Sequence, residues 1–158
     1  MKLNDFFNRL KNKDFFKEFK KENLDLFLVS VFCILSKSEK ESDKITFNFY
    51  SPSKKSFFSS DYPFFEMKLI EEKETELKEL FLNKQSIDID NLKEFVEKII
   101  GGSFSKIICF LLEDGWKLRV FRNDFFIEKI DLNKEGEIIK REKINLKDSF
   151  LNFNKKDF

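Results

Sequence analysis

The chain has 158 residues, enough for one compact domain or two small joined ones with a hydrophobic core. Its 30 basic and 29 acidic residues nearly cancel to a net charge of +1, so no overall electric field draws it to nucleic acid or to an anionic membrane. Aromatic residues make up 16% of the chain, which excludes the composition of a disordered protein.

The N-terminus carries charges and amides where a signal peptide has an apolar segment. The longest apolar run, residues 24–35, is too short to span a bilayer. Two cysteines provide neither a disulfide framework nor a metal-binding set. We therefore expect a cytoplasmic protein with no membrane contact, no cofactor and no bound metal.

The first half predicts short helices followed by four strands. Asn4 and Asp14 are candidate helix caps, and each precedes a stripe of apolar residues. Apolar runs and alternation then predict strands at about 24–36, 44–51, 63–71 and 76–83.

The second half repeats this order. A helix opens it, with Ser86, Asp88 or Asp90 as the cap and the glycine pair 101–102 as the end. Four strands are expected at about 104–113, 116–122, 125–132 and 137–145. The turn sequences "EDG", "RND" and "NKEG" connect them as hairpins.

The two halves align with each other. Residues 14–35 match 90–111 without a gap and bring Cys33 onto Cys109, while 43–52 match 114–123 and 64–77 match 125–138. Chance matching in a composition rich in Lys and Phe is the alternative. The fold class predicted from this alignment is α+β, with two tandem αββββ repeats, each a helix packed on a four-stranded antiparallel sheet. The expected division is 1–85 for the first repeat, 86–146 for the second and 147–158 for a C-terminal tail.

The first strand of each repeat is apolar on both faces, and one helix covers only one of them. Alternation puts Val29, Val31, Cys33 and Leu35 on one face. The opposite face is a candidate interface with the other repeat, with a second copy of the chain or with a different partner, because contiguous exposed apolar surface is uncommon on a monomer. Its candidate residues are Leu28, Phe32, Ile34, Phe110 and Leu112.

The segment "SPSKKSFFSSDYPFF", residues 51–65, has no counterpart in the second half. Its aromatic residues Phe57, Phe58, Tyr62 and Phe64 are typical of side chains that anchor protein interfaces. The alternative, which we favour, is that Phe57 and Phe58 form an extra strand that covers the core.

Tandem αββββ units, each closing with a hairpin such as "FFIEKIDLNKEGEIIKREKI", resemble the group of folds that includes PepSY-like domains and β-lactamase inhibitor proteins. The resemblance covers residues 3 to about 146 at the level of architecture and carries over no functional residue. It implies a non-catalytic binding or inhibitory module whose sheet and loops meet a protein partner.

Catalytic chemistry is poorly supported by the residues. The chain has no histidine, which removes the commonest general base and metal ligand. Neither Cys33 nor Cys109 lies in a CxxC motif, so both are expected in the core. One acidic cluster is interleaved with lysines and is interpreted as a solvated surface; it comprises Glu71, Glu72, Glu74, Glu76 and Glu79. We therefore expect no enzymatic activity.

A basic strip in the second half is a candidate nucleic-acid-binding surface. Its cations are Lys117, Arg119, Arg122, Lys140, Arg141 and Lys143, with Trp116, Phe121 and Phe125 between them for base stacking. Alternation assigns Trp116 to the core, which disfavours nucleic-acid binding. The sequence thus predicts a non-enzymatic protein-binding or inhibitor-like module, with a structural homodimer subunit or a nucleic-acid-binding domain that uses the second sheet as alternatives.

Overall fold

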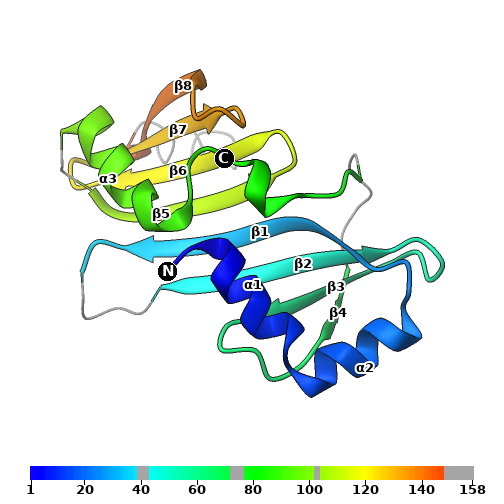
Figure 1. Cartoon of the computed structure of the whole chain (residues 1–158). Coiled ribbons are helices and arrows are strands. Elements are labelled where there is room, and N and C mark those ends of the chain that lie inside the picture. Colours follow the sequence, from blue (N-terminus) through cyan, green and yellow to red (C-terminus); the bar gives the residue numbers. More distant parts are fainter. Residues whose placement is uncertain (39–42, 72–76, 102–103, 148–158) are drawn as a thin grey trace, which may run out of the picture.

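The computed structural model describes residues 1–38, 43–71, 77–101 and 104–147, and these form an α+β fold (Figure 1). Three α-helices accompany one antiparallel sheet of eight strands, in the order β4-β3-β2-β1-β5-β6-β7-β8. The helices are α1 (Leu3–Lys11), α2 (Asp14–Glu22) and α3 (Ile89–Ile100), with a short 3-10 helix η1 (Leu82–Lys84). The strands are β1 (Phe27–Ser36), β2 (Lys44–Ser51), β3 (Ser56–Asp61), β4 (Lys68–Ile70), β5 (Phe104–Leu112), β6 (Gly115–Arg122), β7 (Phe126–Leu132) and β8 (Ile138–Asn145).

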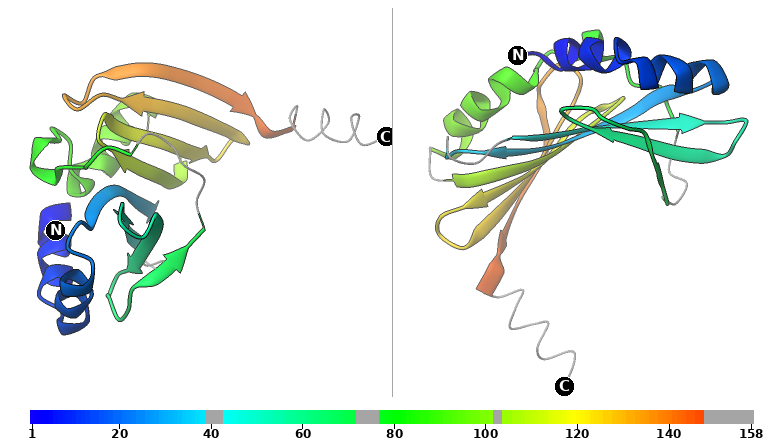
Figure 2. Two further views of the ribbon diagram at one scale, coloured as in Figure 1. Left: turned by 90° about the vertical axis from the view of Figure 1, so that its right-hand side faces the viewer. Right: turned by 90° about the horizontal axis from the view of Figure 1, so that it is seen from below.

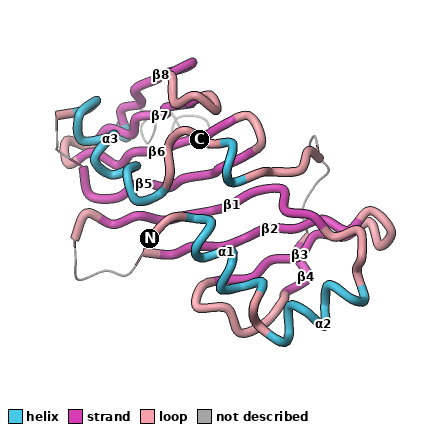
Figure 3. The backbone as a smooth tube through the Cα atoms, viewed as in Figure 1, coloured by secondary structure: helices cyan, strands magenta, loops and turns pink. Residues whose placement is uncertain are grey.

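All three α-helices lie on the same face of the curved sheet (Figure 2). The distribution of helix, strand and loop along the chain is followed most easily in Figure 3. Each helix turns an apolar stripe inward because its apolar residues recur every three or four positions, as Leu3, Phe6 and Leu10 do in α1 and Leu92 and Val96 in α3. Among the described residues, no helix lies over the opposite face of the sheet.

The ends of the helices differ in part from the sequence prediction. Asp88 is the N-cap of α3, and Gly101 ends that helix in the left-handed conformation, with φ +76°. Asn4 and Asp14 are not caps. They lie inside α1 and α2, whose N-cap positions are held by Lys2 and Lys13.

Strands β1 and β5 pair at the centre of the sheet and join the two halves of the chain. Cys33 lies directly opposite Cys109 in this antiparallel register, and Val31 lies opposite Leu111. One cluster of buried residues extends under the helices on both sides of this pairing. The described residues of both halves therefore share a continuous core.

The third and fourth strands of the first half differ in position from those predicted. The third strand is β3, in which Phe57 and Phe58 lie opposite Tyr50 and Phe49 of β2. The expected strand 63–71 contributes only β4, and within the expected strand 76–83 the described residues form irregular chain leading into η1. The alignment of 64–77 with 125–138 therefore does not match equivalent elements of the fold. Residues 126–132 form a strand beside β6, whereas 64–67 form a loop.

The four strands of the second half are confirmed to within one or two residues. Gly115 and Gly136, which belong to the expected turns "EDG" and "NKEG", have positive φ. Phe125 also has positive φ and lies in the turn after "RND", although it was expected to begin the strand. Gly115 is required in its turn, because a Cβ atom would lie 1.9 Å from the backbone oxygen of Leu132.

Candidate functional site

The uncovered face of the sheet has an apolar centre on β1 and β5. The rings of Phe32 and Phe110 lie opposite each other in the register, with their centroids 4.8 Å apart, and Phe110 is 42% exposed. Ile34, Ile108 and Leu112 are half-buried beside them. We call these five residues the central apolar face.

Charged residues border this face on β6 and β7. Lys117 is the cross-strand neighbour of Phe110, and Arg119 is the neighbour of Ile108. Arg119 lies 3.9 Å from Asp131, an ion pair at the surface. The border therefore carries both signs of charge, with cations nearest the apolar centre.

Leu28 does not belong to this face. A register shift between Leu28 and Ser30 interrupts the alternation of β1. Leu28 is consequently buried in the main core beneath the helices, and Val29 packs instead with Tyr50 and Phe57. The prediction that Leu28 shares a face with Phe32 and Ile34 is therefore wrong, because it requires uninterrupted alternation along β1.

Three of the four candidate contact residues of 51–65 are buried. Phe57 and Phe58 are in β3, with 5% and 9% of their surface exposed, so the extra strand that we favoured is present. Phe64 is buried against Phe47, with ring centroids 5.7 Å apart. Tyr62 is the exposed member of the set, and its ring contacts Phe6 edge-on at 5.0 Å.

The basic residues of the second half are divided between the two faces of the sheet. Lys117 and Arg119 border the central apolar face, whereas Arg122 and Arg141 bind the buried carboxylate of Glu128. Trp116 is buried and donates its indole N–H to the backbone oxygen of Ile87, 2.8 Å away. The strip is therefore not one surface, and Trp116 is not available for base stacking.

Within the described residues, no group of acidic or cysteine side chains has the arrangement of a metal site. Glu72, Glu74 and Glu76 of the acidic cluster lie outside the described residues. Cys33 and Cys109 are buried free thiols, and burial raises the pKa of both. None of the helices in the described chain is long and apolar enough to cross a bilayer.

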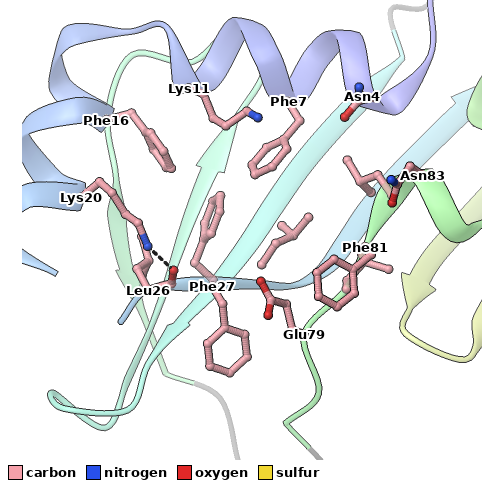
Figure 4. Close-up of a pocket in the computed structure, with 14 residues that line it drawn as sticks. Asn4, Phe7, Lys11, Phe16, Lys20, Leu26, Phe27, Glu79, Phe81 and Asn83 are labelled. Atoms are coloured by element: carbon pink, nitrogen blue, oxygen red, sulfur yellow. Dashed lines mark hydrogen bonds between the residues drawn. The ribbon is translucent and has the colours of Figure 1, made fainter. Parts of the chain in front are cut away.

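A pocket of about 390 Å³ opens between the helices and the chain that precedes η1 (Figure 4). Phe7 of α1 and Phe16 of α2 form one wall, and Phe49 of β2 forms part of the floor. Phe81 forms the opposite wall. Leu80 holds this wall against the beginning of β1, because its N–H donates to the backbone oxygen of Leu28 at 2.8 Å.

Three charged groups line the same pocket. Lys11 lies over the ring of Phe7, with its Nζ 4.8 Å from the centroid. Lys20 donates to the backbone oxygens of Leu24 and Leu26, and Glu79 lies on the other side, beside Phe27. No described side chain of opposite charge forms an ion pair with any of these three groups.

This pocket was not predicted from the sequence. Its lining comes from α1, α2, β1, β2 and the chain before η1, which are far apart in sequence. Each apolar residue matched the ordinary stripe of an amphipathic element. The only sequence signal was the apolar pair Leu80 and Phe81, which was assigned to a strand that is absent.

No known protein-family profile matches the chain, and no curated protein matches it. Among solved structures, a "putative lipoprotein" from Clostridium difficile has a similar fold, with a TM-score of 0.54 and 17% sequence identity. The match covers 85% of this chain and 98% of the other. At this identity the similarity concerns the fold alone.

Proposed function

We propose that this protein is a non-enzymatic module that binds another protein through the central apolar face. The observation that carries the proposal is the pair of rings Phe32 and Phe110, which meet in the middle of an eight-stranded sheet, on the side opposite the three described α-helices. Exposed aromatic residues surrounded by mixed charge are the usual composition of an interface centre and its rim.

The inhibitor-like and PepSY-like resemblance is consistent with this proposal, because it also implies contact through a sheet. The strand order supports the underlying duplication. Strands β1 to β4 lie on one side of the central pairing and β5 to β8 on the other, and Cys33 faces Cys109, the residues that the sequence alignment equates. We infer two αββββ units related by an approximate two-fold axis through this pair.

Photo-crosslinking tests the proposal. A photoreactive phenylalanine analogue at position 110 is compared with the same analogue at position 65, since Phe65 is an even more exposed aromatic residue and lies in the loop after β3. We expect position 110 alone to give a discrete adduct in cells of the source organism. The purified protein identified in that adduct should bind the wild-type chain and lose binding with Phe110→Lys. Equal adducts at both positions, or none at 110, would contradict the proposal.

A homodimer is the second candidate, favoured by the same apolar surface. Light scattering over a concentration series distinguishes the two, because a chain of 19.1 kDa should double its mass if copies associate. A dimer that Phe110→Lys converts to a monomer would assign the face to self-association. A monomer at all concentrations leaves the face to a foreign partner.

We also propose that the protein is cytoplasmic, a compartment in which free thiols such as those of Cys33 and Cys109 stay reduced. Fractionation of cells that express the chain with an epitope tag tests this directly. Recovery with the membranes would overturn the cytoplasmic assignment and would shift the search for partners to the cell surface.

A further inference from the structure

The pocket at the helix face is separate from the central apolar face, because the helices that form it cover the other side of the sheet. We propose that it binds a small apolar carboxylate, such as a short fatty acid. Volume, lining and charge each contribute to this assignment.

The size fits a small organic molecule. A volume of about 390 Å³ lies within the ~300–1,000 Å³ that is usual for ligand pockets. It corresponds to roughly a dozen water-sized volumes of about 30 Å³ each, which accommodates a chain of about eight carbons.

The lining suits an apolar body. The rings of Phe7 and Phe16 both approach Phe49, with centroids 6.1 and 5.5 Å away, and leave an aromatic surface between helix and sheet. Phe81 faces this surface from the opposite wall (Figure 4). An alkyl chain between these walls would be removed from water on both sides, which is the source of most of its binding free energy.

The charges select the head group and its direction. The ammonium groups of Lys11 and Lys20 come from the helices, and Glu79 comes from the opposite side of the pocket. A carboxylate is attracted to the lysines and repelled by Glu79, so it is held at the helix side. Lys11 has the freer ammonium group, because its only described interaction is with the ring of Phe7, whereas Lys20 already binds two carbonyl groups.

The test compares octanoate with octan-1-ol, which has the same alkyl chain without the charge. Both are titrated into the isotopically labelled full chain at low salt, below the concentration at which octanoate forms micelles, and followed by amide NMR. We expect saturable shifts of the Leu80, Phe81 and Asn83 signals and tighter binding of octanoate. Absence of saturable shifts with octanoate would overturn the proposal.

Two matched pairs of variants separate charge from apolar contact. Lys11→Gln should weaken octanoate binding up to about fivefold and leave octan-1-ol unchanged, while Lys17→Gln, an exposed lysine of α2 outside the pocket, should change neither. Phe81→Ala should weaken both ligands, and Phe65→Ala neither. Equal effects of Lys11→Gln and Lys17→Gln would show attraction to net charge rather than a site and would also overturn the proposal.

Discussion

Glu128 is a buried carboxylate held by two arginines, although it lies on the strand face that packs against the core. Only 2% of its side chain is exposed. Its oxygens accept from Arg122 at 3.1 Å and from Arg141 at 2.8 Å. A buried charge is tolerated only when it is paired, so this group depends on both partners.

Replacing Glu128 with Gln should therefore destabilise the fold by roughly 2 kcal/mol, because Arg122 keeps only its ion pair with Asp124 and Arg141 loses its buried counter-charge. Urea unfolding followed by Trp116 fluorescence measures the change. Glu94→Gln is the control, because Glu94 forms an exposed ion pair with Lys98 that is worth about 0.5 kcal/mol or less. Equal losses in the two variants would contradict the assignment.

The two thiols provide a second residue-scale prediction. Burial raises the pKa of Cys33 and Cys109, so the reactive thiolate is scarce at neutral pH and rises only as the pH approaches the raised pKa. We expect the native chain to react with a thiol reagent only as fast as it unfolds. A labelling time course in increasing urea tests this, and rapid reaction without denaturant would disprove it.

At the scale of elements, one aspartate joins two helices that are distant in sequence. The Oδ1 atom of Asp88 accepts from the N–H of Ile89 in α3 at 2.7 Å and from the N–H of Leu3 in α1 at 2.8 Å. It thus satisfies one free donor at the beginning of each helix.

Asp88→Ala should cost about 2 kcal/mol, since a single N-cap is typically worth ~1 kcal/mol and both helices lose a partner. Asp90→Ala is the matched control, because Asp90 is exposed in the first turn of α3 and acts only through the helix dipole, at about 0.5 kcal/mol. Urea unfolding of the two variants measures this, and the midpoint of Asp88→Ala should be lower than that of Asp90→Ala. A loss no larger than that of Asp90→Ala would show that the shared cap contributes nothing.

Strands were predicted correctly from the sequence where the local residue pattern was clear. The second half was predictable because strict alternation in Trp116, Leu118 and Val120 coincides with turn residues at the correct spacing. β3 was harder, because Phe57 and Phe58 are adjacent and both are buried, so the segment has no polar face. The displacement of Leu28 was not predictable, because a bulge depends on the register with the neighbouring strand.

At the scale of the whole molecule, β1 and β5 have six described residue pairs in register and connect the two halves. The buried cluster is shared across this pairing, which favours a single cooperative unit. The same dependence on distant segments explains why the pocket between the helices and Phe81 was not predicted, since it exists only after the chain before η1 has packed on β1.

We therefore predict one unfolding transition, with Trp116 fluorescence and far-ultraviolet circular dichroism giving the same midpoint. Fragments 1–85 and 86–146, expressed separately, should each be poorly folded, because each exposes a long apolar strand that is central in the whole chain. Mixing them should restore the dichroism of the intact protein. Two separated transitions, or independently stable fragments, would show instead that each half is a domain.

The two edge strands, β4 and β8, limit the ways in which copies of this molecule can associate. β4 has only three residues, and β8 presents the charged sequence Lys140, Arg141, Glu142 and Lys143 along its exposed length. Short or charged edges resist the addition of a further strand, so polymerisation into fibrils by lateral growth of the sheet is disfavoured. Self-association through the central apolar face would instead stack two sheets face to face, and because each chain has one such face, this contact stops at two chains.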